Sequence, residues 1–476
     1  MAETKSFLVA GEWRGSEDTL DVASPYDDSV VATIARPSPT DVEDAIAAAH
    51  DTFEESRKLP VHVRAEALAH ISKRLEDRVD EVSEVIAREG GKPIKWAKVE
   101  AARAVSTFRW AAEETRREGG EIMRLDTEPA LGSRLGLVRL FPLGPVLAIA
   151  PFNFPVNLVA HKMAPALAVG APIVIKPATK TPLGALLLGE LFLETDLPEG
   201  MCSVLPVGGS DAGKMAADDR FAKISFTGST EVGWELREAA PKKAVTLELG
   251  GNAGLIVHSD ADLDTASERI AFGGFYQAGQ SCISVQRVLV HEDVADDFNS
   301  KLVTEVEKLK TGDPMDPETD VGPLIDHDAL ERVSAWVDEA VQAGAEVITG
   351  GKREDPFYRP TVLARTKADM KVRCQEIFGP VITVSTYADF DAALDEVNNS
   401  NYGLQAGVFT KDVDRLFKAW RDIEVGGLIA NDVSAFRADQ MPYGGTKDSG
   451  AGREGLRYAM AEMSETKILV LSSIPL

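Results

Sequence analysis

The chain contains 476 residues, which is too many for one small core and fits two large lobes, because domains usually contain roughly 100–200 residues. Its 51 Lys and Arg against 76 Asp and Glu give a formal net charge of −25, which repels phosphate backbones and anionic membrane surfaces. No apolar run reaches the roughly 20 residues that a membrane helix needs, and the first residues lack the layout of a signal peptide. We therefore expect a cytoplasmic protein that binds neither nucleic acid nor membrane.

Only three cysteines occur, Cys202, Cys282 and Cys374, and no two of them form a CxxC pair. This excludes a disulfide framework and a cysteine-rich zinc site. The seven histidines are scattered and form no HExxH motif, so we expect no metal centre.

The first long region, from about residue 41 to 119, is predicted to be helical, because AEALAHISKRLEDRVDEVSEVIA places apolar residues at helical spacing. These helices could cover one face of a sheet. Around residues 124–142, the sequence LGSRLGLVRLFPLGP alternates like a strand and predicts a ribbon, which could form a protruding arm.

A repeated pattern of short apolar strand, turn and helix follows. The predicted strands are GPVLAIAP, PIVIKP, AKISFTG and AVTLELGG, and the segments between them are predicted helices. Such alternation predicts an α/β fold with a parallel, doubly wound sheet whose ligands bind at the carboxyl ends of the strands. From about residue 251 to 450 the alternation resumes in a second unit, with VQRVLVH, AEVITGG and VITVSTY as strands. The tail TKILVLSS could pair with the ribbon of a neighbouring subunit.

Cys282 lies in FYQAGQSCISVQR, where small and polar neighbours make its thiol approachable, whereas Cys202 lies in an apolar run. A half-buried, inert thiol remains an alternative on this pattern alone. A nucleophilic cysteine must become a thiolate, and because its free pKa is about 8.5 it needs a base or a positive dipole nearby. No histidine adjacent in sequence supplies one.

Glu248, in VTLELGGN, is the candidate base, because a carboxyl among apolar residues at the end of a strand has a raised pKa. An ordinary solvent-exposed glutamate is the commoner explanation of this local pattern. Asn153, in APFNFPVN, follows a strand and could donate to a developing oxyanion, although an Asn before a helix is more often a cap.

No GxGxxG fingerprint marks a dinucleotide site. A phosphate could bind instead at the helix start in FTGSTEVG, where Gly228 permits close approach and Ser229 begins the helix, although a simple N-cap explains this pattern equally. Lys176 ends the strand PIVIK and could meet a ribose or phosphate. Glu376, in QEIFGP, could accept from ribose hydroxyls, with Phe378 as an apolar wall. Surface salt bridging is the alternative for Lys176 and Glu376.

Seven motifs occur in one order across nearly the whole chain: PFNFP, KPAT, FTGST, LELGGN, GQSC, EIFGP and PYGGTKDSGAGREG. Together they resemble the aldehyde dehydrogenase superfamily, whose active-site signature is the pair LELGG and GQSC. The resemblance implies a dinucleotide-binding domain (residues 1–123 and 143–250), a catalytic domain (251–450) and a small β oligomerisation element (124–142 and 462–476). It also implies a homodimer or homotetramer.

The resemblance implies that the Cys282 thiolate attacks an aldehyde and that Asn153 and the Cys282 backbone N–H hold the oxyanion. A thioester then forms, and Glu248 activates the water that hydrolyses it. Because Glu248 is present, the acylating, CoA-dependent branch is disfavoured. A non-catalytic structural relative, as in lens crystallins, is disfavoured because nucleophile, base and oxyanion donor are all retained. The implied cofactor site contains Lys176, Gly208, Ser229, Leu249, Glu376 and Phe378.

One departure from the family bears on the choice between NAD and NADP. NAD-preferring relatives usually carry a glutamate three residues after the motif lysine, where it binds the adenine ribose and repels a 2′-phosphate. This position is Thr179 here, followed by Lys180. We therefore expect NADP to be tolerated or preferred, although threonine also permits NAD.

The sequence predicts the identity of the substrate less directly than the reaction. The segments NLVAHK and FRADQMPYGGTKDSG resemble the subgroup of lactaldehyde, phosphonoacetaldehyde and non-phosphorylating glyceraldehyde-3-phosphate dehydrogenases. Ser281 stands before the nucleophile, where phosphate- and phosphonate-specific members tend to carry arginine, so we expect a small polar, hydroxylated or carboxylated aldehyde. Side chains that could bind its hydroxyl or anion are Arg103, Asn157, His161 and Arg437. A helix-surface ion pair is an equal alternative for Arg103.

Overall fold

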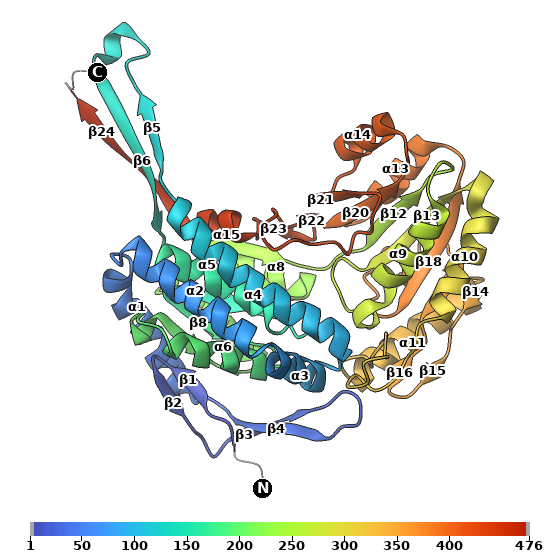
Figure 1. The fold of residues 1–476 in the computed structure, drawn as a ribbon, viewed down its shortest axis with the longest axis horizontal. Coiled ribbons are helices and arrows are strands. Elements are labelled where there is room, and N and C mark those ends of the chain that lie inside the picture. Colours follow the sequence, from blue (N-terminus) through green and yellow to red (C-terminus); the bar gives the residue numbers. More distant parts are fainter. Residues whose placement is uncertain (1–3, 473–476) are drawn as a thin grey trace.

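The computed structural model describes residues 4–472, which form two lobes and a projecting arm (Figure 1). The first lobe is built on an eight-stranded sheet in the order β2-β1-β9-β8-β7-β10-β11-β23. Its five central strands are parallel, while β1, β2 and β23 pair antiparallel at the edges. The strands are β1 (Phe7–Val9), β2 (Glu12–Arg14), β7 (Val146–Ile149), β8 (Ile173–Lys176), β9 (Cys202–Val204), β10 (Lys223–Thr227), β11 (Ala244–Glu248) and β23 (Gly450–Ala451).

The helices of the first lobe show why the sequence folds locally as it does. The first begins after Ser38, whose hydroxyl and the Asp41 carboxylate form a capping box, and it is followed by three more in the region predicted to be helical. Every residue of α5 is buried, because this helix lies between the sheet and the outer helices. The helices are α1 (Pro39–Ser56), α2 (Val61–Asp77), α3 (Val79–Gly90), α4 (Ile94–Arg117), α5 (Asn157–Val169), α6 (Leu183–Leu193), α7 (Gly209–Ala217), α8 (Thr230–Ala239) and α15 (Leu456–Glu462).

The second lobe is built on a seven-stranded sheet in the order β14-β17-β18-β13-β12-β20-β21, parallel except for β14. Its strands are β12 (Ala253–Val257), β13 (Val285–His291), β14 (Glu346–Thr349), β17 (Thr361–Ala364), β18 (Val381–Tyr387), β20 (Gln405–Phe409) and β21 (Gly427–Ala430). Its helices are α9 (Leu263–Phe275), α10 (Ala295–Glu307), α11 (His327–Gln342), α12 (Lys371–Cys374), α13 (Phe390–Asn398) and α14 (Val413–Asp422).

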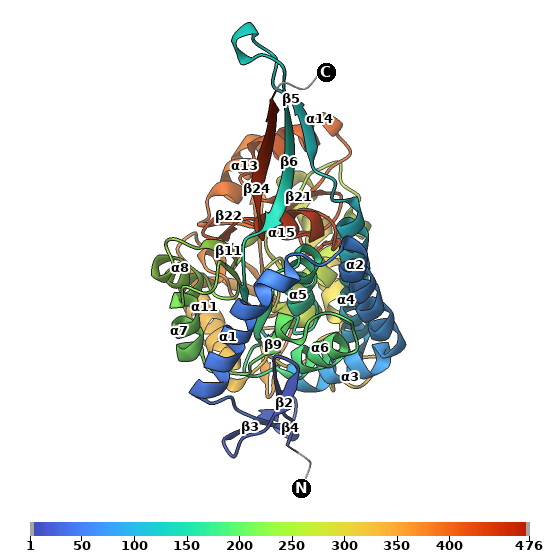
Figure 2. The same ribbon diagram turned by 90° about the vertical axis from the view of Figure 1, so that its left-hand side faces the viewer.

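The arm is a three-stranded antiparallel sheet of β5 (Glu121–Arg124), β6 (Arg134–Pro142) and β24 (Ser464–Ser472) that rises above the body (Figures 1 and 2). β24 pairs with β6 along its whole length, from Ser464 opposite Pro142 to Ser472 opposite Arg134. The C-terminal tail therefore pairs with the ribbon of its own chain through one edge of β24, and pairing with a neighbour's ribbon stays a prediction. Residues 473–476 of the predicted oligomerisation element lie outside the described residues.

Three two-stranded sheets complete the structure: β3 (Thr19–Ala23) with β4 (Val30–Ala35), β15 (Arg353–Glu354) with β16 (Phe357–Tyr358), and β19 (Tyr402–Gly403) with β22 (Thr446–Lys447). Short 3-10 turns occur at Pro129–Leu131, Glu199–Met201, Tyr276–Gly279 and Glu292–Val294. Within residues 4–472, no helix is both long and apolar enough to cross a membrane. The predicted α/β fold with parallel sheets is confirmed, whereas the exact domain boundaries stay a prediction.

The two sheets present opposite strand ends to the interlobe region. In the first lobe, Lys176 and Glu248 are the last residues of β8 and β11, at the carboxyl ends where a doubly wound sheet binds ligands. In the second lobe, Cys282 precedes β13 and Glu376 precedes β18, so its contributions come from the amino ends of parallel strands. The candidate site therefore combines the carboxyl ends of strands in the first lobe with the amino ends of strands in the second lobe.

Candidate active site

Cys282 is held by a tightly constrained turn between α9 and β13. Gln277 and Ala278 adopt left-handed backbone conformations with φ of 55° and 52°. Gly279 has φ of 69°, and a Cβ there would lie 2.1 Å from the carbonyl oxygen of Gly379, so only glycine fits. The turn presents a half-buried Cys282 whose Sγ lies 2.9 Å from the hydroxyl oxygen of Tyr443.

The electrostatics around Cys282 favour the neutral thiol in the resting structure. Burial raises the pKa of Cys282 to about 12, while the hydrogen bond with Tyr443 and the charge of Arg437 act in the opposite direction. A thiolate at neutral pH therefore needs help from polar neighbours. Cys202 is fully buried in an apolar strand, and burial raises its pKa to about 12, which is consistent with an inert structural thiol.

Glu248 ends β11 and is only 3% exposed. Neither of its carboxyl oxygens has a hydrogen-bond partner in the described part of the chain. Burial, followed by the charge of Glu454, raises the pKa of Glu248 well above its usual value. A Cβ on Gly444 would lie 2.9 Å from Glu248 Oε1, so the Tyr443–Gly444 segment touches both the thiol and this carboxyl. The ordinary solvent-exposed glutamate is thereby excluded.

Asn153 follows β7 and reaches the turn that carries the thiol. Its Nδ2 donates a hydrogen bond of 3.0 Å to the carbonyl of Gln280, and its Oδ1 has no partner among the described residues. The N-cap of α5 is Val156, so Asn153 is not a helix cap. Nδ2 carries a second hydrogen beyond the one donated to Gln280, and this hydrogen suits the predicted oxyanion donor.

A buried charge network that the sequence reasoning missed lies behind the thiol. Lys162, on α5, donates to Glu454 at 3.0 Å and to the hydroxyls of Ser225 and Thr227 at 3.2 and 2.7 Å. Arg437 donates to the other oxygen of Glu454 at 2.9 Å. Burial would raise the pKa of Glu454, but the charges of Lys162 and Arg437 prevail and lower it to about 2. Glu454 is therefore a carboxylate shared by two cations.

The four predicted substrate residues fall into two groups. Arg437 belongs to the network with Glu454, whereas the other three converge on Asp439 Oδ1, at 2.9 Å for Arg103, 3.3 Å for Asn157 and 3.0 Å for His161. Burial works against ionisation of Asp439, but the His161 hydrogen bond and the charge of Arg103 hold the pKa of its carboxyl below its usual value. Arg103 is thus not paired within its own helix, and Asp439 is a further residue that sequence did not indicate.

Lys176 is 8% exposed and has no side-chain partner among the described residues, and burial lowers its pKa. Surface salt bridging is thereby excluded for this cation. Glu376 Oε1 accepts from the Gly251 N–H at 2.9 Å, and burial raises the pKa of Glu376 to about 7. Phe378 has φ of 46° and packs edge-on against Phe152.

Two of the predicted cofactor residues lie at the starts of helices in the first lobe. Gly208 is the N-cap of α7 and Ser229 that of α8, and the Ser229 side chain makes no capping bond. A Cβ on Gly228 would lie 2.6 Å from the Phe226 ring, and Leu249 packs against α8 at Gly233. Helix N-termini with unpaired N–H groups bind phosphate, and the unpartnered, buried Lys176 calls for an anion. These residues therefore fit a dinucleotide.

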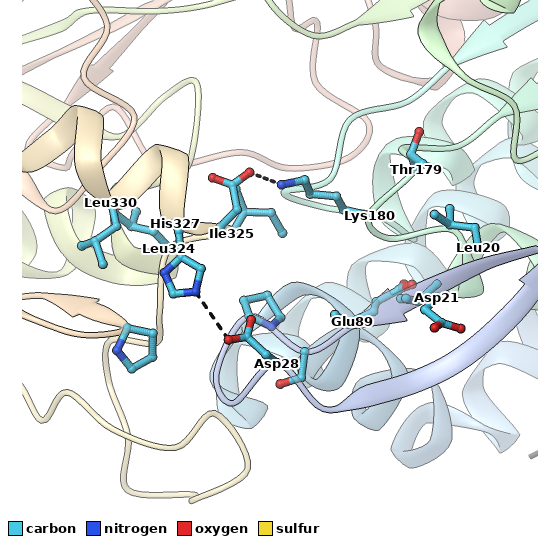
Figure 3. A pocket seen from close by; sticks show the side chains of 16 residues that line it. Leu20, Asp21, Asp28, Glu89, Thr179, Lys180, Leu324, Ile325, His327 and Leu330 are labelled. Carbon is cyan, nitrogen blue, oxygen red and sulfur yellow. Dashed lines mark hydrogen bonds and ion pairs between the residues drawn. The ribbon is translucent and has the colours of Figure 1, made fainter. Parts of the chain in front are cut away.

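Thr179 and Lys180 lie at the edge of a cavity of about 360 Å³ between the β3–β4 hairpin and the start of α11 (Figure 3). Lys180 reaches across to form an ion pair with Asp326, the N-cap residue of α11. His327 contacts Asp28 of the hairpin at 3.4 Å. Both contacts join the second lobe to the first, and the charge of Lys180 is already paired with Asp326. The neutral Thr179 occupies the position where NAD-preferring relatives usually carry the ribose-binding glutamate.

A family model described as "Aldehyde dehydrogenase family" matches residues 13–469. The chain belongs to the aldehyde dehydrogenase family. It is an NAD(P)-dependent enzyme, as the solved structures of its relatives with NADP also indicate. The resemblance drawn from the seven motifs is confirmed.

Three relatives of this aldehyde dehydrogenase are informative. A 3-sulfolactaldehyde dehydrogenase of Priestia aryabhattai is 44% identical over 465 residues, covering 98% of this chain and 97% of the relative. The crystal structure of aldehyde dehydrogenase 21 from Physcomitrella patens, in complex with the reaction product succinate, is 43% identical, with a TM-score of 0.98 and full coverage of both chains. A glyceraldehyde-3-phosphate dehydrogenase of Methanocaldococcus jannaschii, complexed with NADP, is 38% identical with a TM-score of 0.91, covering 95% of this chain and 99% of that one.

Proposed function

We propose that the enzyme oxidises a small aldehyde carrying an anionic group to the free acid through a thioester on Cys282. The observation that carries this proposal is a set of buried polar atoms around Cys282 that lack hydrogen-bond partners in the described part of the chain. They are Asn153 Oδ1, His161 Nδ1, both carboxyl oxygens of Glu248 and Arg437 Nε. Because buried polar groups are normally paired, such a cluster is typical of a site that binds a polar ligand.

In the proposed reaction the Cys282 thiolate attacks the aldehyde carbon, and the carbonyl electron pair moves to oxygen. The oxyanion accepts hydrogen bonds from Asn153 Nδ2 and the Cys282 backbone N–H. NAD(P)⁺, when bound, supplies the acceptor for the two electrons that leave the substrate carbon. Glu248 then takes a proton from the water that attacks the thioester, for which its raised pKa suits it near neutral pH.

The charges at the site favour an anionic substrate. Arg103, Arg437 and Lys162 contribute three positive charges, and Asp439 and Glu454 contribute two negative ones. Burial lowers the pKa of His161 and raises that of Glu248, which favours the neutral form of each side chain. Among these five side chains the positive charges exceed the negative ones by one, and Arg453 adds a further positive charge near Glu248. A positive charge in a low-dielectric environment is stabilised by a partner of opposite sign.

The relatives support the same substrate class. One is named for an aldehyde that bears a sulfonate, and another holds succinate, a product with a second carboxylate. Ser281 in place of an arginine before the nucleophile argues against a phosphorylated aldehyde. We therefore propose a sulfonate or a carboxylate as the anionic group, held by the unpaired donors of Arg437 and by Arg103.

The proposal is tested with pairs of aldehydes that differ only in charge: succinic semialdehyde against butanal, and 3-sulfolactaldehyde against lactaldehyde, each with NAD⁺ and NADP⁺. We expect kcat/KM for the charged member to exceed that for the neutral one at least tenfold. Arg103→Gln should reduce this ratio and leave the neutral aldehydes nearly unaffected, because it removes the charge of a partly exposed side chain. Equal or greater activity on the neutral aldehydes contradicts the proposal.

We also propose that the enzyme is a cytoplasmic homodimer or homotetramer. The arm carries apolar side chains that are highly exposed in the single chain, including Ile122 at 75%, Ile468 at 52% and Leu469 at 57%. Exposed apolar patches of this kind mark protein interfaces. The three free cysteines, one of them the proposed nucleophile, suit a reducing compartment. Light scattering after size exclusion, with Ile122→Lys as the arm variant, tests the assembly, and a monomeric wild type refutes it.

A further inference from the structure

Backbone and side-chain contacts hold Tyr443 against the thiol of Cys282. Its backbone forms an antiparallel bridge with Glu454, with N···O distances of 3.0 and 2.7 Å, and only 3% of the residue is exposed. Its ring packs with Ile283 and Leu404 beside the nucleophile. The hydroxyl oxygen lies 2.9 Å from Cys282 Sγ, and no other side chain of residues 4–472 makes a hydrogen bond with this sulfur.

Arg437 reinforces the position and the polarity of this hydroxyl. The guanidinium carbon lies 3.7 Å from the centre of the Tyr443 ring, a close cation–π contact in a buried environment. The guanidinium itself is anchored by Glu454, the same residue that pairs with the Tyr443 backbone. A cation over the ring withdraws electron density from the phenol, so the hydroxyl becomes a stronger hydrogen-bond donor to an anion.

We propose that the Tyr443 hydroxyl is a catalytic group that stabilises the Cys282 thiolate by donating a hydrogen bond to Sγ, with Arg437 as the residue that positions and polarises it. The inference rests on the proposed role of Cys282 as nucleophile. When the thiol ionises, its proton leaves the sulfur for a base or solvent, while Tyr443 keeps its own proton and transfers none. The phenol thereby stabilises the thiolate by a hydrogen bond and does not act as the proton-accepting base that a histidine would supply.

The decisive measurement is the pH dependence of Cys282 alkylation by iodoacetamide, which reports the thiolate without any aldehyde. The exposed Cys374 is first replaced by serine, so that the label reports the active-site thiol. Tyr443→Phe removes one oxygen atom and keeps the ring under Arg437. Because a hydrogen bond to a charged group contributes about 1.5–3 kcal/mol, we expect the alkylation rate at neutral pH to fall about 10- to 100-fold, which corresponds to a rise of the midpoint by about one to two pH units.

Tyr276→Phe is the matched control, because Tyr276 is a partly buried phenol of the same turn whose hydroxyl donates to Ser281 at 2.8 Å and not to the sulfur. Its alkylation midpoint should stay at the wild-type value. Arg437→Lys keeps the charge beside Glu454 but loses the planar contact with the ring, and it should raise the midpoint by less than Tyr443→Phe does. Unchanged melting temperatures show that each variant is folded.

Kinetics separates this inference from the proposed function. In Tyr443→Phe the first turnover of NAD(P)H formation should slow at least tenfold at pH 7 and recover at higher pH. An alkylation midpoint that does not move in Tyr443→Phe overturns the inference, whatever the substrate proves to be. A midpoint that moves while the first turnover keeps its rate refutes instead the thioester chemistry on Cys282.

Discussion

Replacing Glu248 by glutamine tests the proposed hydrolytic half of the reaction. The amide has nearly the shape of the carboxyl, and neither oxygen of Glu248 has a partner among the described residues, so no hydrogen bond of the fold is lost. General base catalysis by a positioned side chain contributes about 10²–10⁴-fold in rate. We therefore expect steady-state turnover to fall by that factor, which corresponds to about 2.7–5.5 kcal/mol in the barrier of the hydrolysis step.

A stopped-flow record of NAD(P)H absorbance distinguishes the two steps. Glu248→Gln should still give a first burst of about one NAD(P)H per active site, because thioester formation precedes hydrolysis, and then stall. In the wild type the ionised carboxyl is the active form, so steady-state turnover should rise with pH through the raised pKa of Glu248 and lose this dependence in Glu248→Gln. Unchanged steady-state rates in the variant would refute the assignment of Glu248 as the base.

Three further changes test other parts of the site. Cys282→Ala should abolish aldehyde-dependent NAD(P)H formation while fluorescence titration still detects cofactor binding, and substantial turnover would exclude the thioester. Thr179→Glu should shift the ratio of kcat/KM values toward NAD⁺, since a carboxylate repels a 2′-phosphate; an unaltered ratio removes Thr179 from cofactor selection. Lys162→Met should lower the free energy of unfolding by about 3–5 kcal/mol, because Glu454 loses one of its two buried cations, and an unchanged melting temperature would show that Arg437 alone compensates it.

The sequence predicted the parts of the site that depend on local pattern. Glu248 and Lys176 end short apolar strands, and the parallel arrangement of such strands brings their carboxyl ends to one rim. Cys282 was recognisable from its glycine-rich, polar surroundings, and Gly279 proved to be required by a positive φ. Local pattern did not favour Glu248 or Asn153 on its own, because burial and contact with the thiol-bearing turn arise only from the tertiary structure.

The residues that the sequence reasoning missed depend on contacts between distant segments. Lys162 meets Glu454 across 292 residues, and Asp439 meets His161 across 278. A charged side chain in a local window is normally solvated, so nothing in the motif around Glu454 or Asp439 predicts burial. One usable signal existed for Lys162, which lies in a largely apolar helix. Every residue of this helix is buried. No comparable signal marks the Tyr443 hydroxyl as a partner of the thiol.

Repulsion between the charges of Cys282 and Glu248 implies that the thiolate and the base ionise one after the other. Ionised Glu248 raises the pKa of Cys282, because two negative charges in a buried site repel each other. Glu248 should therefore be protonated while the thiolate attacks, and ionise once the sulfur is neutral in the thioester. Glu248→Gln should accordingly leave the alkylation midpoint of Cys282 near its wild-type value, unlike Tyr443→Phe, because a protonated carboxyl and an amide are both uncharged. A midpoint that moves upward would show instead that the Glu248 carboxylate promotes ionisation of the thiol.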